Sequence, residues 1–79
     1  MRKESNTMSF SEAFEYLKNG YRIRRIGWGG YWALENGEVI MHCVSNEGRE
    51  LTPINIKDTD DIMFTLSNIA ANDWIVTSG

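Results

Sequence analysis

The sequence has very few of the residues that cross-link small proteins or bind metals: one cysteine (Cys43), one histidine (His42) and one proline (Pro53). A single cysteine excludes an internal disulfide, and one cysteine with one histidine cannot supply the four ligands of a structural zinc site. No apolar run approaches the roughly 20 residues that span a bilayer, and no signal-peptide core follows MRKESNT. We therefore expect no metal, no cofactor and no membrane contact, in a reducing cytoplasm.

Basic residues are also in the minority: the chain has eight Lys and Arg and eleven Asp and Glu, which gives a net charge of −3. Proteins that hold DNA or RNA polymers carry a broad basic footprint, and this chain has only a local one. Signals for catalysis are missing too: there is no nucleophile elbow, and no phosphate-cradling glycine loop precedes a helix. Cys43 and His42 are strand neighbours that face opposite sides, so they cannot form a dyad. The sequence predicts binding without catalysis.

The chain is short, at 79 residues, and we interpret residues 1–79 as a single domain. A domain of this size buries only about 60% of its unfolded surface, so its core is small. Small scaffolds compensate with disulfides, metals or assembly, and only assembly is open to this chain. We therefore expect a homo-oligomer. The polar residues 1–8 are expected to be disordered.

One helix is predicted near the N-terminus, at about residues 10–19. Ser9 and Glu12 have the spacing of a capping box, and Asn19-Gly20 is a C-terminal stop signal. The helical spacing i, i+3, i+4, i+7 is met by apolar side chains at Phe10, Ala13, Phe14 and Leu17. This apolar stripe is expected to pack on a sheet.

A hairpin is the clearest prediction, because Asn36-Gly37 is the preferred pair for a two-residue type I′ turn. The turn sets the register, with Leu34 opposite Val39 and Trp32 opposite Met41. These four residues share one face; Tyr31, Ala33, Ile40 and His42 share the other. Neither face is fully polar, so we expect one face to meet the helix and the other to meet a second subunit.

The strand before the hairpin, at residues 21–26, contains an irregularity. Arg24 and Arg25 are adjacent, and adjacent strand residues point to opposite faces, so one arginine must face the helix or the pairing must bulge there.

The second half of the chain is predicted from weaker signals. The expected segments are a turn at 45–48, a strand at 49–52 ended by Pro53, a charged loop at 57–61, a docking apolar triplet at 62–64, a helical turn at 67–71 and a strand at 73–76 anchored by Trp74. The predicted fold class is α+β: one N-terminal helix packed on an antiparallel sheet of about five strands.

Residues 22–32 concentrate the chemistry of the chain. The stretch contains three arginines (Arg22, Arg24, Arg25), three aromatics (Trp28, Tyr31, Trp32) and, between them, three glycines. Guanidinium groups match phosphate oxygens, aromatic faces stack on bases, and glycines let a backbone approach a ligand. The stretch predicts a small ligand with both phosphate and base. An equally compatible interpretation puts the tryptophans in the core and the arginines in solvent.

The run SFSEAFEYLKNGYRIRRIGW resembles the opening F-x-x-A-L-x-x-L-K-x-G-K-x-V-x-R-x-G-W pattern of a small phage family. The matching residues are Phe10, Ala13, Phe14 in place of leucine, Leu17, Lys18, Gly20, Ile23, Arg25, Gly27 and Trp28, with Arg22 one position after the pattern's second lysine. The end NIAANDWIV is similar to the family's D-L-L-A-x-D-W-x-V close, and EVIMHCVSNEGRELTP resembles its strand–turn–strand ending in a proline. The similarity covers nearly all of residues 9–77.

That family includes the second type of Thoeris anti-defence proteins, which are phage sponges for cyclic ADP-ribose-type signals made by bacterial TIR-domain enzymes. The resemblance implies a glycocyclic ADP-ribose-type ligand held without cleavage, homotetramers with pockets between subunits, and a site of action in the cytoplasm of the infected bacterial host. Some members also capture cyclic oligonucleotides. This chain departs from the family at Ile54, where an aromatic is common, and at residues 55–66, which look like an insertion. Both departures leave the pocket wall and the ligand isomer open.

The predicted ligand site centres on Trp28, which is expected to stack on adenine or to form a wall of the pocket. Arg24 or Arg25 is expected to hold a phosphate, and Tyr31 or Trp32 to close the side. Further candidate contacts are Phe10, which is also expected to pack in the core, and Thr52, Pro53 and Asp73. The competing interpretation is a phage structural or protein–protein adaptor domain whose Arg/Trp stretch contacts a protein. A hydrolase of the same nucleotides is a third.

Overall fold

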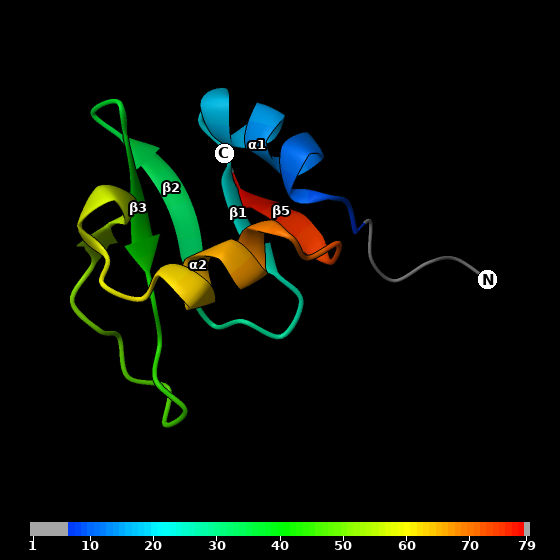
Figure 1. Cartoon of the computed structure of the whole chain (residues 1–79). Coiled ribbons are helices and arrows are strands. Elements are labelled where there is room, and N and C mark those ends of the chain that lie inside the picture. Colours follow the sequence, from blue (N-terminus) through cyan, green and yellow to red (C-terminus); the bar gives the residue numbers. More distant parts are fainter. Residues whose placement is uncertain (1–6, 79) are drawn as a thin grey trace.

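The computed structural model describes residues 7–78, in which one face of a five-stranded antiparallel sheet carries a helix (Figure 1). The strand order is β4-β3-β2-β1-β5. The elements are α1 (Phe10–Lys18), β1 (Arg22–Arg25), β2 (Tyr31–Glu35), β3 (Glu38–His42), β4 (Ile54–Asn55), the 3-10 helix η1 (Ile56–Asp58), α2 (Ile62–Ile69) and β5 (Trp74–Ser78). The predicted α+β class is confirmed, and the structure adds a second helix.

Helix α1 begins with the predicted capping box. The Ser9 hydroxyl accepts a hydrogen bond from the Glu12 amide at 3.2 Å, and the Glu12 carboxylate accepts one from the Ser9 amide at 3.1 Å. Ala13 and Leu17 are fully buried against the sheet, whereas Phe14 lies at the border of the contact and is partly exposed. The helical stripe therefore packs as predicted along its centre.

The hairpin of β2 and β3 has the predicted register, with Trp32 opposite Met41 and Leu34 opposite Val39. Its turn residues Asn36 and Gly37 both have positive φ, at 54° and 80°, as a type I′ turn requires. Local turn chemistry thus determines the alignment of the two longest neighbouring strands.

The core lies between α1 and the sheet. Its buried residues are Ala13, Leu17, Ile23, Trp32, Met41 and Trp74. Trp74 is fully buried, and its Nε1 donates to the carbonyl oxygen of Asn68 at 2.8 Å. The ring centroids of Trp74 and Trp32 lie 5.0 Å apart. The prediction that Trp74 anchors the last strand in the core is confirmed.

The start of the described chain is paired with its end. Met8 exchanges two backbone hydrogen bonds with Trp74, at 2.9 and 3.1 Å. The prediction that residues 1–8 are disordered is therefore wrong for Met8, which is paired with β5. Residues 1–6 lie outside the described residues. The register shift in β1 falls between Arg22 and Ile23, two residues earlier than the predicted bulge.

The connection from β3 to β4 differs from the prediction. The expected strand at 49–52 is reduced to a single bridge between Val44 and Glu50. Strand β4 instead follows Pro53, where Ile54 pairs with Met41. A proline lacks an amide to donate, but it can stand directly ahead of a strand, so Pro53 precedes the pairing and does not end it.

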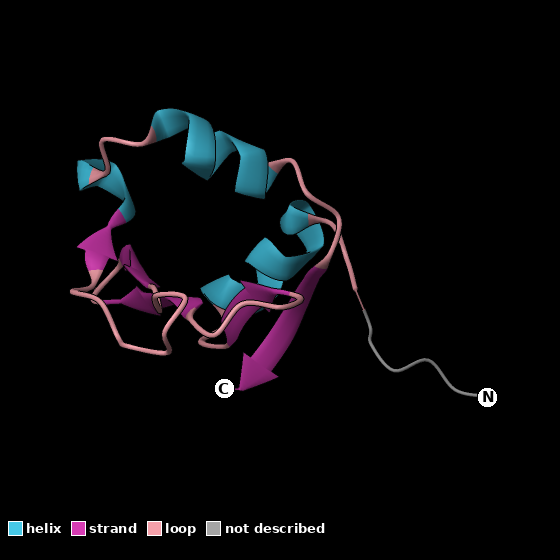
Figure 2. Cartoon of the chain, turned by 90° about the horizontal axis from the view of Figure 1, so that it is seen from below, coloured by secondary structure: helices cyan, strands magenta, loops and turns pink. Residues whose placement is uncertain are grey.

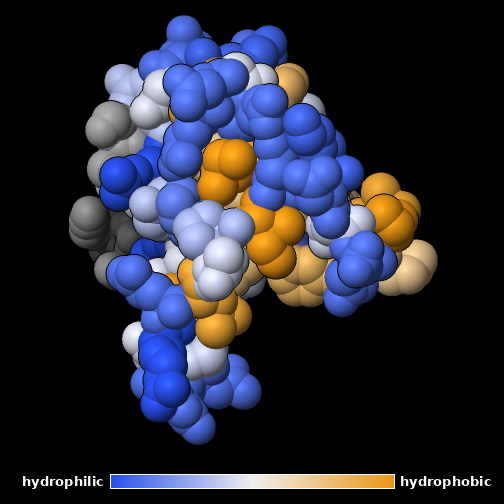
Figure 3. Space-filling view, turned by 90° about the vertical axis from the view of Figure 1, so that its left-hand side faces the viewer, coloured by the Kyte–Doolittle hydropathy of each residue, from blue (hydrophilic) through white to orange (hydrophobic). Residues whose placement is uncertain are grey.

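Helix α2 has its polar side inward. The triplet at 62–64 was predicted to dock, and this prediction is wrong, because Met63 is 72% exposed while Thr65 and Asn68 are buried. The other exposed large apolar side chains of the helix are Ile62, Phe64, Leu66 and Ile69. Figure 2 shows α2 on the same side of the sheet as α1, and Figure 3 shows apolar side chains exposed among hydrophilic ones. Neither α1 nor α2, the helices of residues 7–78, is long and apolar enough to cross a bilayer.

Candidate functional site

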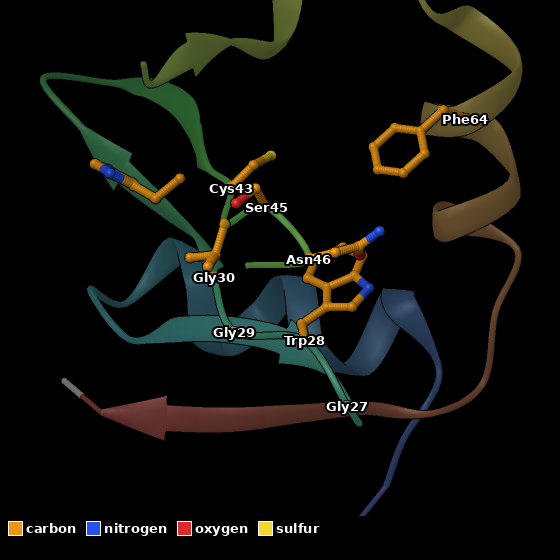
Figure 4. A pocket seen from close by; sticks show the side chains of 10 residues that line it. Gly27, Trp28, Gly29, Gly30, Cys43, Ser45, Asn46 and Phe64 are labelled. Carbon is orange, nitrogen blue, oxygen red and sulfur yellow. The ribbon is translucent and has the colours of Figure 1, made fainter. Parts of the chain in front are cut away.

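A cavity of about 410 Å³ opens beside the hairpin, between the turn that precedes β2, the segment that follows β3, and helix α2 (Figure 4). Its lining residues are Gly27, Trp28, Gly29, Gly30, His42, Cys43, Val44, Ser45, Asn46 and Phe64. Small-molecule sites occupy about 300–1,000 Å³, so the volume fits a ligand of nucleotide class.

Two aromatic rings from separate segments line this cavity. Trp28 rises from the turn before β2, and Phe64 reaches toward it from α2 (Figure 4). Trp28 is fixed from behind by Trp74, at a centroid distance of 5.2 Å, and by Trp32, at 6.0 Å. A half-buried indole held in this way can present its ring to a planar group, as stacking on a base requires.

Glycines form the floor between the walls. A Cβ at Gly30 would lie 2.0 Å from the carbonyl oxygen of His42, so the two backbones approach too closely for any side chain. Gly27 has a φ of +91°, a left-handed conformation that favours glycine. This part of the lining is therefore bare backbone, and Gly30 is required by the close approach of the His42 backbone; that the glycines admit a ligand stays a prediction.

The cavity wall carries no permanent charge. None of its ten lining residues is Lys, Arg, Asp or Glu. Burial raises the pKa of the Cys43 thiol, so this residue stays protonated at neutral pH. Within residues 7–78, no cluster of His, Cys, Asp and Glu is placed to hold a metal ion. The cavity suits an uncharged, planar part of a ligand.

Arg25 does not line the cavity. Its Nε donates to one carboxylate oxygen of Asp73 at 2.7 Å and its Nη2 to the other at 3.2 Å, while Nη1 donates to Asn68 Oδ1 at 2.8 Å. This two-pronged contact joins β1 to the last turn of α2 and to the start of β5. Arg25 thus positions the helix that carries Phe64. The sequence analysis named Arg25 as a possible phosphate ligand, and this geometry does not support that assignment.

Arg24 lies on the other side of β1, under the turn that carries Trp28. Its Nη1 donates to the carbonyl oxygens of Arg25 at 3.3 Å and Trp28 at 3.1 Å. Its Nε and Nη2 groups have no acceptor among residues 7–78, which leaves three N–H donors available. Of the two predicted phosphate ligands, Arg24 is the one with free donors, but it contacts only the Trp28 carbonyl and, like Arg25, does not line the cavity.

Tyr31 and Trp32, the predicted side walls, do not line this cavity. Trp32 is 1% exposed and belongs to the core. Tyr31 faces the opposite side of the sheet, where it stacks on His42 at a centroid distance of 4.5 Å and carries the Arg22 guanidinium 4.4 Å above its ring. The closing role given to these two aromatics falls instead to Phe64.

The remaining candidates also lie elsewhere. Phe10 packs edge-on against Trp74, at a centroid distance of 5.2 Å, as a member of the core shell. Thr52 is exposed and lines neither described cavity, and Pro53 borders a separate cavity of about 130 Å³. Asp73 is bound to Arg25. None of these four residues meets Trp28 across the 410 Å³ cavity.

Sequence reasoning missed Phe64 and Asn46 as lining residues. Phe64 was assigned to a docking triplet, and Asn46 only to a turn. Phe64 did carry a signal in the sequence. It is an aromatic residue that follows a charged loop, and the predicted core did not require it, so a role at the surface or at a ligand was open to it. Asn46 had no local signal, because turns commonly contain asparagine.

Asp73 supplies an acid-sensitive contact. Its hydrogen bonds from Arg25 lower the pKa of the Asp73 carboxyl, so the folded state favours the ionised form. A lowered pKa stabilises the fold above the unfolded pKa of about 3.9, and this contribution is lost as pH falls through the folded value.

We therefore expect Asp73→Asn to be less stable at pH 7 and to have a flatter acid limb in a plot of Tm against pH, from about pH 5 downward. Asp60→Asn, at an exposed carboxylate, is the matched control and should follow the wild type. An acid limb of Asp73→Asn as steep as that of the wild type would show that the contact with Arg25 carries no pH-dependent stability.

The comparisons with known proteins give one match. A family model described as Tad2-like, the Thoeris anti-defense 2-like domain, matches residues 8–77. No curated protein and no solved structure matches the chain at a significant level. The matched range contains both aromatic walls and the glycine floor of the cavity.

Proposed function

The chain belongs to the Thoeris anti-defense 2-like domain family and so has an anti-defence role, and we propose that it acts by sequestering a signalling nucleotide. The proposed ligand is a cyclic ADP-ribose-type molecule, of the glycocyclic ADP-ribose class, made by a TIR-domain enzyme in the cytoplasm of the infected bacterium. The observation that carries the proposal is the cavity that Trp28 and Phe64 line together with Gly27, Gly29 and Gly30.

In this proposal the two parts of the ligand are held by different groups. Adenine is neutral and planar, so it matches an uncharged cavity between two aromatic rings. The pyrophosphate matches a guanidinium, and Arg24, which lies outside the cavity under the Trp28 turn, has N–H groups without an acceptor among residues 7–78. Cyclic oligonucleotides contain the same base and phosphate chemistry and are a second possible ligand class.

We propose that the ligand is stored and not cleaved. His42 is the last residue of β3 and Cys43 follows it; the His42 imidazole stacks on Tyr31 and its Nε2 lies 2.7 Å from a Glu35 carboxylate oxygen, so the imidazole is paired with Glu35 and not with the Cys43 thiol. The raised pKa of the Cys43 thiol also disfavours the thiolate that a nucleophile needs. The direct test is to incubate the protein with the TIR-enzyme product, heat it, and analyse the supernatant by mass spectrometry. Recovery of the intact signal supports a sponge, its degradation indicates a hydrolase, and no uptake at all indicates an adaptor domain.

Removing either aromatic wall should weaken binding. We expect Trp28→Ala and Phe64→Ala each to reduce the binding free energy for a glycocyclic ADP-ribose isomer by about 1–3 kcal/mol, the usual value of one base stack. Isothermal titration calorimetry measures the change. Phe64→Ala is the cleaner variant, because Phe64 is exposed on α2 whereas Trp28 also packs on Trp74.

Phe14→Ala is the matched control for these variants, since Phe14 is a partly exposed phenylalanine on α1 that does not line the cavity. Wild-type affinity in both Trp28→Ala and Phe64→Ala would move the site away from this cavity.

We further propose that the protein is a homo-oligomer, with a tetramer as the expected form. The support is the exposed apolar side of α2, which a monomer would leave in water. Phe64 is part of both this surface and the cavity, so assembly through α2 would place the site next to a second subunit. The sequence located the interface on the second face of the hairpin, and α2 provides a larger set of exposed apolar residues.

A further inference from the structure

Asn46 is an exposed residue of the cavity lining whose side-chain amide has no hydrogen-bond partner among residues 7–78. It lies on the turn after β3 and lines the cavity close to Trp28 (Figure 4). Two other polar residues of the wall are already engaged. Ser45 Oγ accepts hydrogen bonds from two backbone amides, and His42 Nε2 lies 2.7 Å from a carboxylate oxygen of Glu35. The Asn46 carboxamide makes no hydrogen bond with any of residues 7–78, so its donor and its acceptor are both available.

The backbone that carries Asn46 is held in place. Ser45 Oγ accepts from the amides of Glu47 at 3.3 Å and Arg49 at 3.2 Å, and the Ser45 amide donates to the Arg49 carbonyl at 2.8 Å. The Gly48 amide closes the turn on the Ser45 carbonyl at 2.9 Å. Ser45 is therefore a positioning residue, which fixes the location from which the Asn46 side chain reaches into the cavity.

We propose that Asn46 selects adenine by reading the N6/N7 edge of a base stacked between Trp28 and Phe64. This inference rests on the proposed function, and it names the base that the site prefers. A carboxamide presents one donor and one acceptor side by side, and adenine presents the complementary pair, the N6 amino group and the N7 acceptor. Hypoxanthine presents two acceptors on the same edge, O6 and N7, so the amide can satisfy only one of them.

The test is calorimetry with two probes: a glycocyclic ADP-ribose isomer and the same molecule with hypoxanthine in place of adenine. The wild type should bind the adenine form about 5- to 150-fold more tightly, the fold-change equivalent of the 1–3 kcal/mol that one bidentate pair contributes. Asn46→Ala should bind both forms equally, because it loses two hydrogen bonds to the adenine form and only one to the hypoxanthine form. Asn46 has no positive φ, so alanine does not strain the turn.

Asn72→Ala, at another exposed asparagine outside the cavity, is the matched control and should keep the wild-type preference. Equal binding of both probes by the wild type would overturn the inference and leave sequestration standing. A preference that survives in Asn46→Ala would assign base selection to another group and also overturn it. Failure of the wild type to bind either probe would remove the proposed ligand class itself.

Discussion

Replacing Trp74 by alanine is expected to lower the free energy of unfolding by about 3–5 kcal/mol, the range for a large aromatic removed from a core. Trp74 is fully buried and lies within 5.2 Å, between ring centroids, of Phe10, Trp28 and Trp32. Its Nε1 also satisfies the buried carbonyl of Asn68. Domains are stable by only about 5–15 kcal/mol, so this single change consumes much of the total.

Urea denaturation followed by far-UV circular dichroism, at fixed protein concentration, measures the loss. Trp74→Phe separates the two contributions, because it keeps a ring in the core and removes the indole hydrogen bond to the Asn68 carbonyl, which then accepts only from the Ala71 amide; we expect an intermediate value. Trp28→Ala is the matched tryptophan variant at a half-buried position and should lose less. A Trp74→Ala protein with wild-type stability that fails only to bind ligand would make Trp74 a ligand contact.

The second large effect is expected on assembly. The double variant Met63→Asp/Leu66→Asp should convert the oligomer to a monomer of 9.1 kDa. Both side chains are more than half exposed on α2, so neither change removes core packing. Each introduced carboxylate would have to be desolvated in an apolar interface, which costs several kcal/mol per unpaired ion.

Size-exclusion chromatography with light scattering, at micromolar concentration, distinguishes the two forms, and circular dichroism verifies that the variant is folded. Tyr16→Asp alters an exposed aromatic on α1 and should leave the mass unchanged. A wild type found only as a monomer would contradict the oligomer. An oligomer that persists in the double variant would move the interface to the second face of the hairpin, where Tyr31 and Ile40 lie.

The parts of the fold that could be predicted are those determined by local chemistry. The Ser9 and Glu12 capping box located the start of α1, and Asn36-Gly37 located the hairpin turn and its register. The alternation rule also required Arg24 and Arg25 to face opposite sides. The structure places Arg25 on the helix side, opposite Trp74.

Helix α2 could not be predicted because its burial is decided by tertiary contacts. Apolar residues usually face the core, so Ile62 to Phe64 were expected to dock. In the structure the inward positions are polar: Thr65 donates to the Asp61 carbonyl at 3.1 Å, and Asn68 accepts from Arg25 at its side chain and from Trp74 at its backbone carbonyl. The buried Asn68 Nδ2 has no acceptor among residues 7–78. The partners of Thr65 and Asn68 are distant in sequence or depend on side-chain geometry, and no local pattern encodes them.

The candidate site was predicted in part. Trp28 and the glycines next to it form one wall and the floor of the cavity, as their composition suggested. Phe64 and Asn46 come from separate later segments, and only the folded sheet brings them to Trp28. The sequence could not decide which of Arg24 and Arg25 is free to bind a phosphate. The answer depends on Asp73, which binds Arg25 from nearly fifty residues away, and no sequence pattern predicts that pair.

The two strands that pair with β1 lie at very different distances from it along the chain. Ile23 lies opposite Trp32 in β2, which follows a short connection, and opposite Val76 in β5, more than fifty residues later. The entropy of closing a loop grows with its length, and non-local pairing is what makes sheets slow to form. The hairpin consists of local contacts, whereas the sheet is completed only when Trp74 arrives. Trp74, which anchors the core, is thus also the residue whose packing must compensate for the entropy lost in closing the longest loop of the described domain.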